Sequence, residues 1–261
     1  MSRPASMPTV GDQITARLTG FLLTTAAREL VSRFVQADQQ VALPLLLEVL
    51  ELEAQERHER RITRLRRASK LPPGKTFATL DEGRLPPALV RRLHELGEGD
   101  FLADATNILA FGLPGVGKSH AMCAVGHALV DRGHAVLFMP AYSLVQELLA
   151  AKRNLELPRA LRKLDHFAVL LLDDVGYIQQ SPEEAEILFT LLAERYERRS
   201  VCITSNLVFA QWDRIFRDQM ATAAAIDRLV HHSVLLEFDV PSFRTEQAKR
   251  LVTSKRSHRS D

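Results

Sequence analysis

Eight residues, GLPGVGKS at positions 112–119, constrain the fold of this chain more than any other stretch. They fit the pattern G-x-x-x-x-G-K-[ST] at every fixed position, with the apolar run NILAF before them and the helix-forming run SHAMCAVGHALV overlapping and following them. Glycines let backbone N–H groups approach a polyphosphate closely, and the N-terminus of the following helix adds positive potential. The segment therefore predicts a phosphate-binding loop between a strand and a helix.

The side chains and backbone of this loop have distinct expected parts in binding. Lys118 can reach the β- and γ-phosphates of a nucleotide, and the Ser119 hydroxyl can ligate Mg²⁺. The other expected nucleotide contacts are Gly112, Leu113, Pro114, Gly115, Val116, Gly117 and His120.

After residue 100 the sequence alternates between short β-like runs and helical runs. The β-like runs are 107–111, 135–139, 168–172, 201–204 and 234–238, and the helical runs are near 118–132, 143–153, 182–198 and 221–231. This alternation predicts an α/β fold in which helices cover both faces of a five-stranded parallel sheet. Ligands of such sheets bind at the carboxyl ends of the strands.

Two of these runs end in polar side chains. The run AVLLLDD ends in Asp173 and Asp174, and Asn206 follows the run VCITS. Asp173 is expected to hold Mg²⁺, while Asp174 and Asn206 orient a water molecule for attack on the γ-phosphate. The adjacent acids indicate ATP hydrolysis, although many such ATPases carry Glu where Asp174 stands. The alternatives are a helix N-cap pair for the acids and a turn residue for the asparagine.

Two arginines near the end of the chain are candidates for contact with the γ-phosphate. Arg228 lies in the helical run 221–231, and a planar guanidinium supplied by a neighbouring subunit would act as an arginine finger. The alternative is a surface arginine paired with a local acid. Arg244, in PSFR, is the weaker candidate.

The first hundred residues predict helices. Leu22, Leu23, Ala26, Leu30 and Phe34 recur at helical spacing. Pro44 suits the first turn of a second long helix, with Leu45, Leu46, Val49, Leu50 and Leu52 as its apolar face. The expected organisation is a disordered segment 1–10, a helical domain 11–70, a linker 71–100, a core 101–243 and a basic tail 244–261.

The formal net charge of +2 conceals two basic segments. Residues 57–75 contain eight basic residues and one acidic residue, and residues 244–261 contain six basic and two acidic residues. Within the first segment, Arg57, Arg60, Arg61 and Arg64 share one helix face, and Arg67 follows in the same run. This basic stripe suits the phosphates of duplex DNA without reading bases. A solvated helix face or a protein-docking surface is the alternative.

Cysteine and histidine usage excludes several classes of protein. Cys123 and Cys202 are the two cysteines, too few for a disulfide scaffold or a zinc ribbon. Cys123 and His127 are expected in the core, and the pair His231–His232 has no third metal ligand in view. The N-terminus has no apolar run of signal-peptide or membrane-spanning length, so we expect a cytoplasmic protein without membrane contact.

Six motifs occur in order along the chain: LPPGKTF, GLPGVGKS, LLLDDVGY, LLAERYERRS, ITSNLVFAQW and AAAIDRLVHHSVLLEFDVPSFR. Together they resemble the IstB-like family, the ATP-binding helper proteins encoded beside transposases in insertion sequences. The chain is similar also to DnaC-type helicase loaders. The resemblance extends from about residue 12 to about residue 250.

The resemblance implies an AAA+ P-loop core after a small helical domain, with no C-terminal lid. It also implies that homo-oligomers assemble on duplex DNA with ATP, select target sites and stimulate a partner transposase. Asn206 matches the first sensor and Arg228 the finger in trans, while Lys75 and Thr76 match the segment near the nucleotide base. The family usually has Tyr where Phe243 stands.

Three other functions remain open. A helicase loader would bind a helicase ring and prefer single-stranded DNA. A metabolite kinase would need an acceptor pocket and a lid, for which the sequence has no candidate. A DNA-binding scaffold would use ATP only as a structural ligand.

Overall fold

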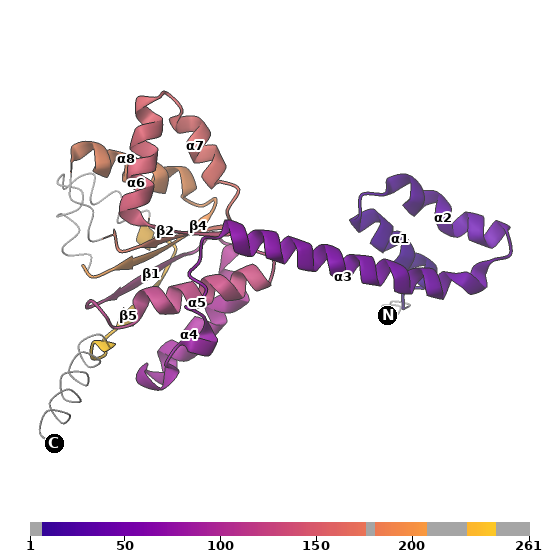
Figure 1. The fold of residues 1–261 in the computed structure, drawn as a ribbon, viewed down its shortest axis with the longest axis horizontal. Helices are drawn as coiled ribbons and strands as arrows, with labels where there is room; N and C mark the ends of the chain where they lie inside the picture. The colour runs from indigo at the N-terminus through magenta and orange to yellow at the C-terminus, as the bar shows by residue number, and fades with distance from the viewer. Residues whose placement is uncertain (1–6, 176–180, 208–228, 244–261) are drawn as a thin grey trace, which may run out of the picture. The chain divides into compact units, whose positions relative to one another are not determined.

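The computed structural model describes residues 7–175, 181–207 and 229–243 (Figure 1). The chain divides into two units, Met1–Thr63 and Arg64–Asp261. The expectations for the first six residues, for the tail 244–261 and for the absence of a lid concern parts of the chain outside the described residues. Within the described ranges, no helix has both the length and the apolar character that a membrane span requires.

The first unit is helical. It contains α1 (Val10–Gly20), α2 (Thr24–Gln36), the short helix η1 (Gln40–Ala42) and most of α3 (Leu43–Ala68). Thr9 begins α1 with a capping box, since its Oγ1 accepts from Asp12 N at 3.2 Å and its N–H donates to Asp12 Oδ2 at 2.9 Å. Ile14, Leu18 and Leu43 form the buried centre of the unit.

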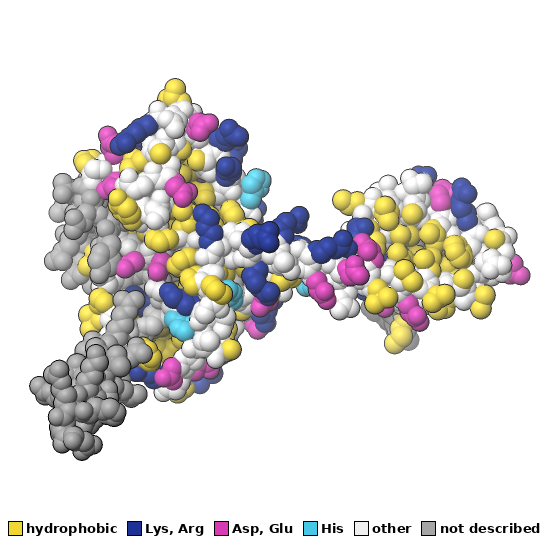
Figure 2. Space-filling model, viewed as in Figure 1, with side chains coloured by type: hydrophobic (Ala, Val, Ile, Leu, Met, Phe, Trp, Pro, Cys, Tyr) yellow, Lys and Arg dark blue, Asp and Glu magenta, His cyan; other side chains and the backbone are white. Residues whose placement is uncertain are grey.

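The predicted apolar face of α3 is wrong in part. Leu46 and Leu50 pack on the buried centre of the first unit. Leu45, Val49 and Leu52 are instead 64%, 54% and 63% exposed. The reason is that α3 carries apolar residues on two sides, and the short helices α1 and α2 cover one of them. Figure 2 shows hydrophobic side chains gathered on the surface of this unit.

The second unit contains the predicted five-stranded parallel sheet, with the order β2-β3-β4-β1-β5. The strands are β1 (Asn107–Gly112), β2 (Val136–Pro140), β3 (Val169–Asp173), β4 (Ser200–Ser205) and β5 (Ser233–Phe238). All four strand pairings are parallel, so the predicted α/β fold class is confirmed. The central part of the sheet brings the carboxyl ends of β3, β4 and β1 side by side.

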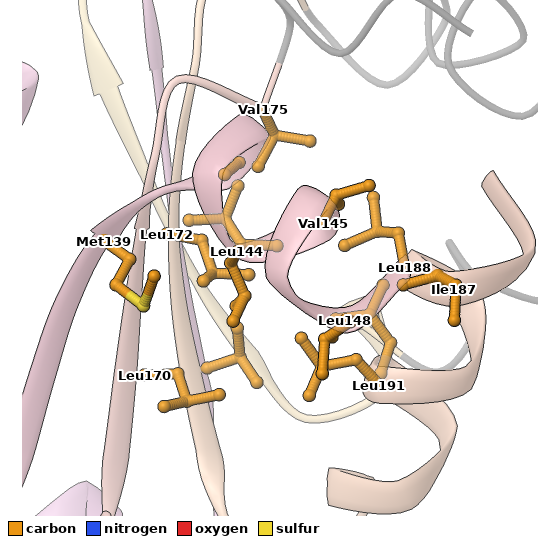
Figure 3. Close-up of a cluster of buried hydrophobic side chains, with 14 of the residues drawn as sticks. Met139, Leu144, Val145, Leu148, Leu170, Leu172, Val175, Ile187, Leu188 and Leu191 are labelled. Carbon is orange, nitrogen blue, oxygen red and sulfur yellow. The ribbon is translucent and has the colours of Figure 1, made fainter. Parts of the chain in front are cut away.

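Helices cover both faces of the sheet, because successive strand residues point to opposite sides. On one face lie α4 (Pro87–Glu98) and α5 (Lys118–Asp131). On the other lie α6 (Ala141–Arg153), α7 (Leu157–Leu164) and α8 (Pro182–Arg195). In β3, Leu171 joins the first core, while Leu170 and Leu172 join the second, where they meet side chains of α6 and α8 (Figure 3).

The segment 71–100 is not the linker expected from the sequence. It forms the short helices η2 (Phe77–Thr79), η3 (Glu82–Arg84) and η4 (Asp100–Leu102) around α4. Leu93 and Leu96 of α4 are buried in the core beside α5. Pro86-Pro87 and Gly99 bound this helix, since proline suits a first turn and glycine a left-handed C-cap.

Arg195 is a buried residue of α8, and its side chain binds backbone near the starts of β3 and β4. Its guanidinium donates to the carbonyl oxygens of Leu164, Phe167 and Ser200 at 3.0, 2.9 and 3.1 Å. Burial lowers the pKa of this side chain to about 10. The charge is nevertheless kept at neutral pH, and it satisfies carbonyls that the core would otherwise leave without donors.

Candidate nucleotide-binding site

The phosphate loop follows the end of β1, a buried strand paired on both sides. Gly112 has φ +152°, and a Cβ there would meet Phe238 O at 2.5 Å. Gly117 has φ +101°, and a Cβ there would point into open space before the N-terminus of α5. Glycine is required at both positions, for close packing at the first and for the backbone turn at the second.

Lys118 is held within the loop. Its side chain is buried, and Nζ donates to Gly112 O at 2.6 Å and to Leu113 O at 2.9 Å. The ammonium therefore lies beside the first turn of α5, where backbone N–H groups are without helical partners. Positive charge and unpaired donors at one place fit a polyphosphate.

The acids at the end of β3 are tied to β4 by a threonine that sequence reasoning missed. Thr204 Oγ1 donates to Asp173 Oδ1 at 2.6 Å and accepts from Asp174 N at 2.9 Å. Thr204 is buried. One hydroxyl thus orients a carboxylate that can ligate Mg²⁺ and fixes the backbone of the next acid, which has φ +64°. The sequence could have indicated this role of Thr204 only if the strand register were known. In that register Leu172 pairs with Ile203, so Asp173 and Thr204 follow side by side.

Asn206 follows β4 at the same edge of the sheet. Its Oδ1 is buried and has no hydrogen-bond partner among the described residues. Asn206 lies within a turn that is held by Ser205, whose Oγ accepts from Leu207 N at 3.0 Å. A buried acceptor without a donor fits the predicted role of orienting a water molecule, which can donate to it. The residues present therefore fit a nucleotide with Mg²⁺.

A pocket of about 440 Å³ lies beside the phosphate loop. Lys75 is among its lining residues, and Arg84 places its guanidinium 5.0 Å from the centre of the Phe243 ring. Thr76 is not among the residues that line this pocket, and its carbonyl oxygen accepts from His120 Nε2 at 3.2 Å. Sequence reasoning missed further lining residues, including Leu80, Asp81, Arg84, Leu85 and Val240.

The segment after β5 is attached to the loop. Phe243 N donates to Gly115 O at 2.9 Å. Phe243 and Gly115 are both among the residues that line the pocket. The mixture of apolar walls and planar groups suits a nucleotide base next to its phosphates.

Neither predicted arginine can be placed. Arg228 and Arg244 lie outside the described residues. Their roles stay predictions.

The basic stripe on α3 is partly compensated by acids that precede it. Arg57 bonds Glu53 at 2.5 Å and lies 4.3 Å over the Phe21 ring, and Arg60 pairs with Glu53 and Glu56 at 3.5 Å. The basic segment was defined from residue 57 onward, so it left out Glu53 and Glu56, which lie about one helical turn earlier. Exposed pairs of this kind are weak, so phosphates can still compete for the arginines.

Cys123 is buried in the core as predicted, whereas His127 is only half-buried. Burial raises the pKa of both thiols, Cys123 and Cys202, to about 12, so both stay protonated at neutral pH. His127 Nε2 forms a hydrogen bond of 3.0 Å with Pro72 O.

The sheet order, the phosphate loop after β1 and the acids at the end of β3, with β4 between these two strands, define a P-loop protein with the AAA+ fold. The model of the IstB-like ATP-binding protein family matches residues 15–251. The chain therefore belongs to this family.

Relatives and solved structures agree with this assignment. An insertion-sequence ATP-binding protein of Sinorhizobium fredii is 43% identical over 216 residues, which cover 82% of this chain and 72% of that protein. The insertion sequence IS21 ATP-binding protein of Pseudomonas aeruginosa is 38% identical, with coverage of 74% and 73%.

Two solved structures show the same fold at 18% identity. The DnaC helicase loader has a TM-score of 0.51 and covers 58% of this chain and 89% of its own. The replication initiator DnaA, bound to AMPPCP and single-stranded DNA, has a TM-score of 0.56 and coverage of 71% and 56%.

Proposed function

We propose that this chain hydrolyses ATP with Mg²⁺, and that ATP drives its assembly on duplex DNA as the helper of a transposase. The observation that carries the proposal is the carboxyl edge of the sheet, where the phosphate loop follows β1 and the acids fixed by Thr204 follow β3, with β4 between them. Membership of the insertion-sequence family supports the role in transposition.

The side chains divide the chemistry among them. Lys118 binds the β- and γ-phosphates, and Ser119 and Asp173 hold Mg²⁺. Bound Mg²⁺ neutralises charge that develops on the phosphate oxygens. Asp174 accepts a proton from the attacking water, and Asn206 orients that water through its buried oxygen.

Assembly would complete the site. Arg228 of a neighbouring copy supplies an arginine finger in this proposal, which makes hydrolysis depend on oligomerisation. ATP would then favour the assembled form, because its γ-phosphate contacts both subunits. Hydrolysis would release the helper from DNA.

The direct test measures phosphate release and particle size with the full chain, ATP and Mg²⁺, with and without duplex DNA. We expect larger particles with ATP and faster phosphate release when duplex DNA is added. The cognate transposase should gain strand-transfer activity only when this chain and ATP are both present. Capture of a replicative helicase together with a preference for single-stranded DNA would contradict the proposal.

Neutralising Arg60, Arg61 and Arg64 together is expected to weaken duplex binding and flatten its salt dependence. Each lost phosphate contact lowers the slope of log K against log[salt] by about 0.9, so a decrease of about two to three is expected. Fluorescence anisotropy across a salt series measures the slope.

The matched control neutralises three exposed arginines away from α3: Arg153, Arg159 and Arg162. This variant should keep the slope of the unmodified chain. An unchanged slope in the α3 variant would place the DNA site elsewhere.

A further inference from the structure

We propose that Glu197, His231 and His232 form a binding site for a divalent transition-metal ion such as Zn²⁺. The structure brings together one ligand atom from each of these exposed residues, and all three atoms lie within 4.8 Å of one another. The histidines precede β5 directly, and the glutamate lies in the turn between α8 and β4. The third ligand that the sequence left unidentified for the histidine pair is therefore Glu197.

The spacing of the donor atoms suits a small ion after a modest contraction. Zinc binds imidazole nitrogen and carboxylate oxygen at about 2.0–2.2 Å, so tetrahedral donors lie about 3.3–3.6 Å apart. His232 Nε2 and Glu197 Oε1 are already 3.9 Å apart. Rotation of exposed side chains can provide the remaining movement, and water can complete the coordination.

The two rings are already oriented by their neighbours. His231 Nδ1 and Tyr196 Oη form a hydrogen bond of 3.2 Å, and the His231 and His232 rings meet edge to face at 4.3 Å. Metal-binding histidines commonly donate their second ring N–H to an oxygen, which fixes the tautomer. His231 would thus bind the metal through Nε2 and donate from Nδ1 to Tyr196.

The backbone below the cluster is held by a buried asparagine at the start of β1. Asn107 N donates to His232 O at 2.7 Å, and Asn107 Nδ2 donates to Leu229 O at 3.3 Å. Its Oδ1 accepts from Val201 N at 2.9 Å, which ties the start of β4 to the same point. Both segments that carry ligands are therefore anchored to one side chain.

Glu197 adopts a left-handed backbone conformation in the turn after α8. Its φ is +54°, in the left-handed region that costs energy for a residue with a long side chain. Glycine or asparagine usually occupies such a position after a helix. Here the strained backbone carries the carboxylate that approaches the histidine pair.

The donor set distinguishes this site from the nucleotide site. Two nitrogens and one oxygen favour Zn²⁺ and its neighbours in the transition series, whereas Mg²⁺ prefers oxygen ligands alone. The cluster lies where β4 and β5 begin, and the phosphate loop lies where β1 ends. Since all strands are parallel, the cluster lies at the amino ends of the strands and the phosphate loop at their carboxyl ends.

Zinc titration of the full chain, after removal of metals with a chelator and dialysis, tests the site. Competition with a chromogenic indicator should show that each chain binds one Zn²⁺ ion through Glu197, His231 and His232. We expect Glu197→Gln and His232→Ala each to lower the zinc affinity by about a hundredfold or more. Tyr196→Phe should lower it by about tenfold, because Tyr196 only forms a hydrogen bond with the ligand His231. Circular dichroism checks that the variants are folded.

His94→Ala is the matched control, because His94 is exposed and meets one carboxylate, Glu82, at 2.8 Å. It should bind zinc as the unmodified chain does. Zinc held at the nucleotide site would persist in Glu197→Gln. Equal zinc affinity in the unmodified chain, Glu197→Gln and His232→Ala would overturn the proposal, as would an equal loss in His94→Ala.

Discussion

Replacing Lys118 by alanine is expected to weaken ATP binding by about a hundredfold and to abolish ATP-dependent assembly. A charge-assisted hydrogen bond to phosphate contributes about 1.5–3 kcal/mol, and no other side chain of the loop carries a positive charge. Titration with a fluorescent ATP analogue measures the affinity, and light scattering with ATP measures particle size.

Lys75→Ala is the control for this variant, because Lys75 lines the same pocket outside the phosphate loop. Its loss should cost less than about tenfold in affinity, since exposed charges interact weakly. Lys118→Met keeps most of the buried volume and separates lost charge from a packing defect. Assembly of Lys118→Ala to normal size with ATP would contradict the mechanism.

Changing Asp174 to asparagine is expected to reduce phosphate release by about 10²–10⁴-fold, with little change in ATP affinity. Asparagine keeps the shape of the side chain but cannot accept the proton of the attacking water. The backbone bond from this residue to Thr204 does not involve the side chain, so the turn is preserved. A coupled phosphate-release assay with DNA measures the rate.

Two kinds of variant make the result specific. Asp131→Asn removes a surface carboxylate that pairs with Arg66, and its rate should match that of the unmodified chain. Thr204→Val removes the hydroxyl that orients Asp173, so it should raise the Mg²⁺ concentration required, whereas Thr204→Ser should restore it. Equal rates for Asp174→Asn and the unmodified chain would exclude the assigned role in water activation.

Much of the fold of the second unit follows from local sequence. The five strands were predicted within two residues at each end, because each is a short and mostly apolar run. The phosphate loop follows from its own glycines and lysine. Asp173 and Asn206 could be proposed as site residues because they stand where apolar runs stop.

Contacts between distant segments were beyond this reasoning. Thr204 acts on Asp173 only because β3 and β4 are neighbours, and the chain does not state which strands pair. Arg84 reaches Phe243 across more than half of the chain. Glu197 meets His231 for the same reason. In α3, two apolar stripes gave no local sign of which one the partner helices cover.

The position of β1 has a consequence for hydrogen exchange. β1 is paired with β4 on one side and β5 on the other, so its amides are protected from both directions. Amides of such a strand exchange only when the whole unit opens, whereas those of the edge strand β2 can exchange through smaller openings. The phosphate loop therefore begins at one of the slowest-exchanging points of the chain, and its glycines hold their geometry before any nucleotide binds.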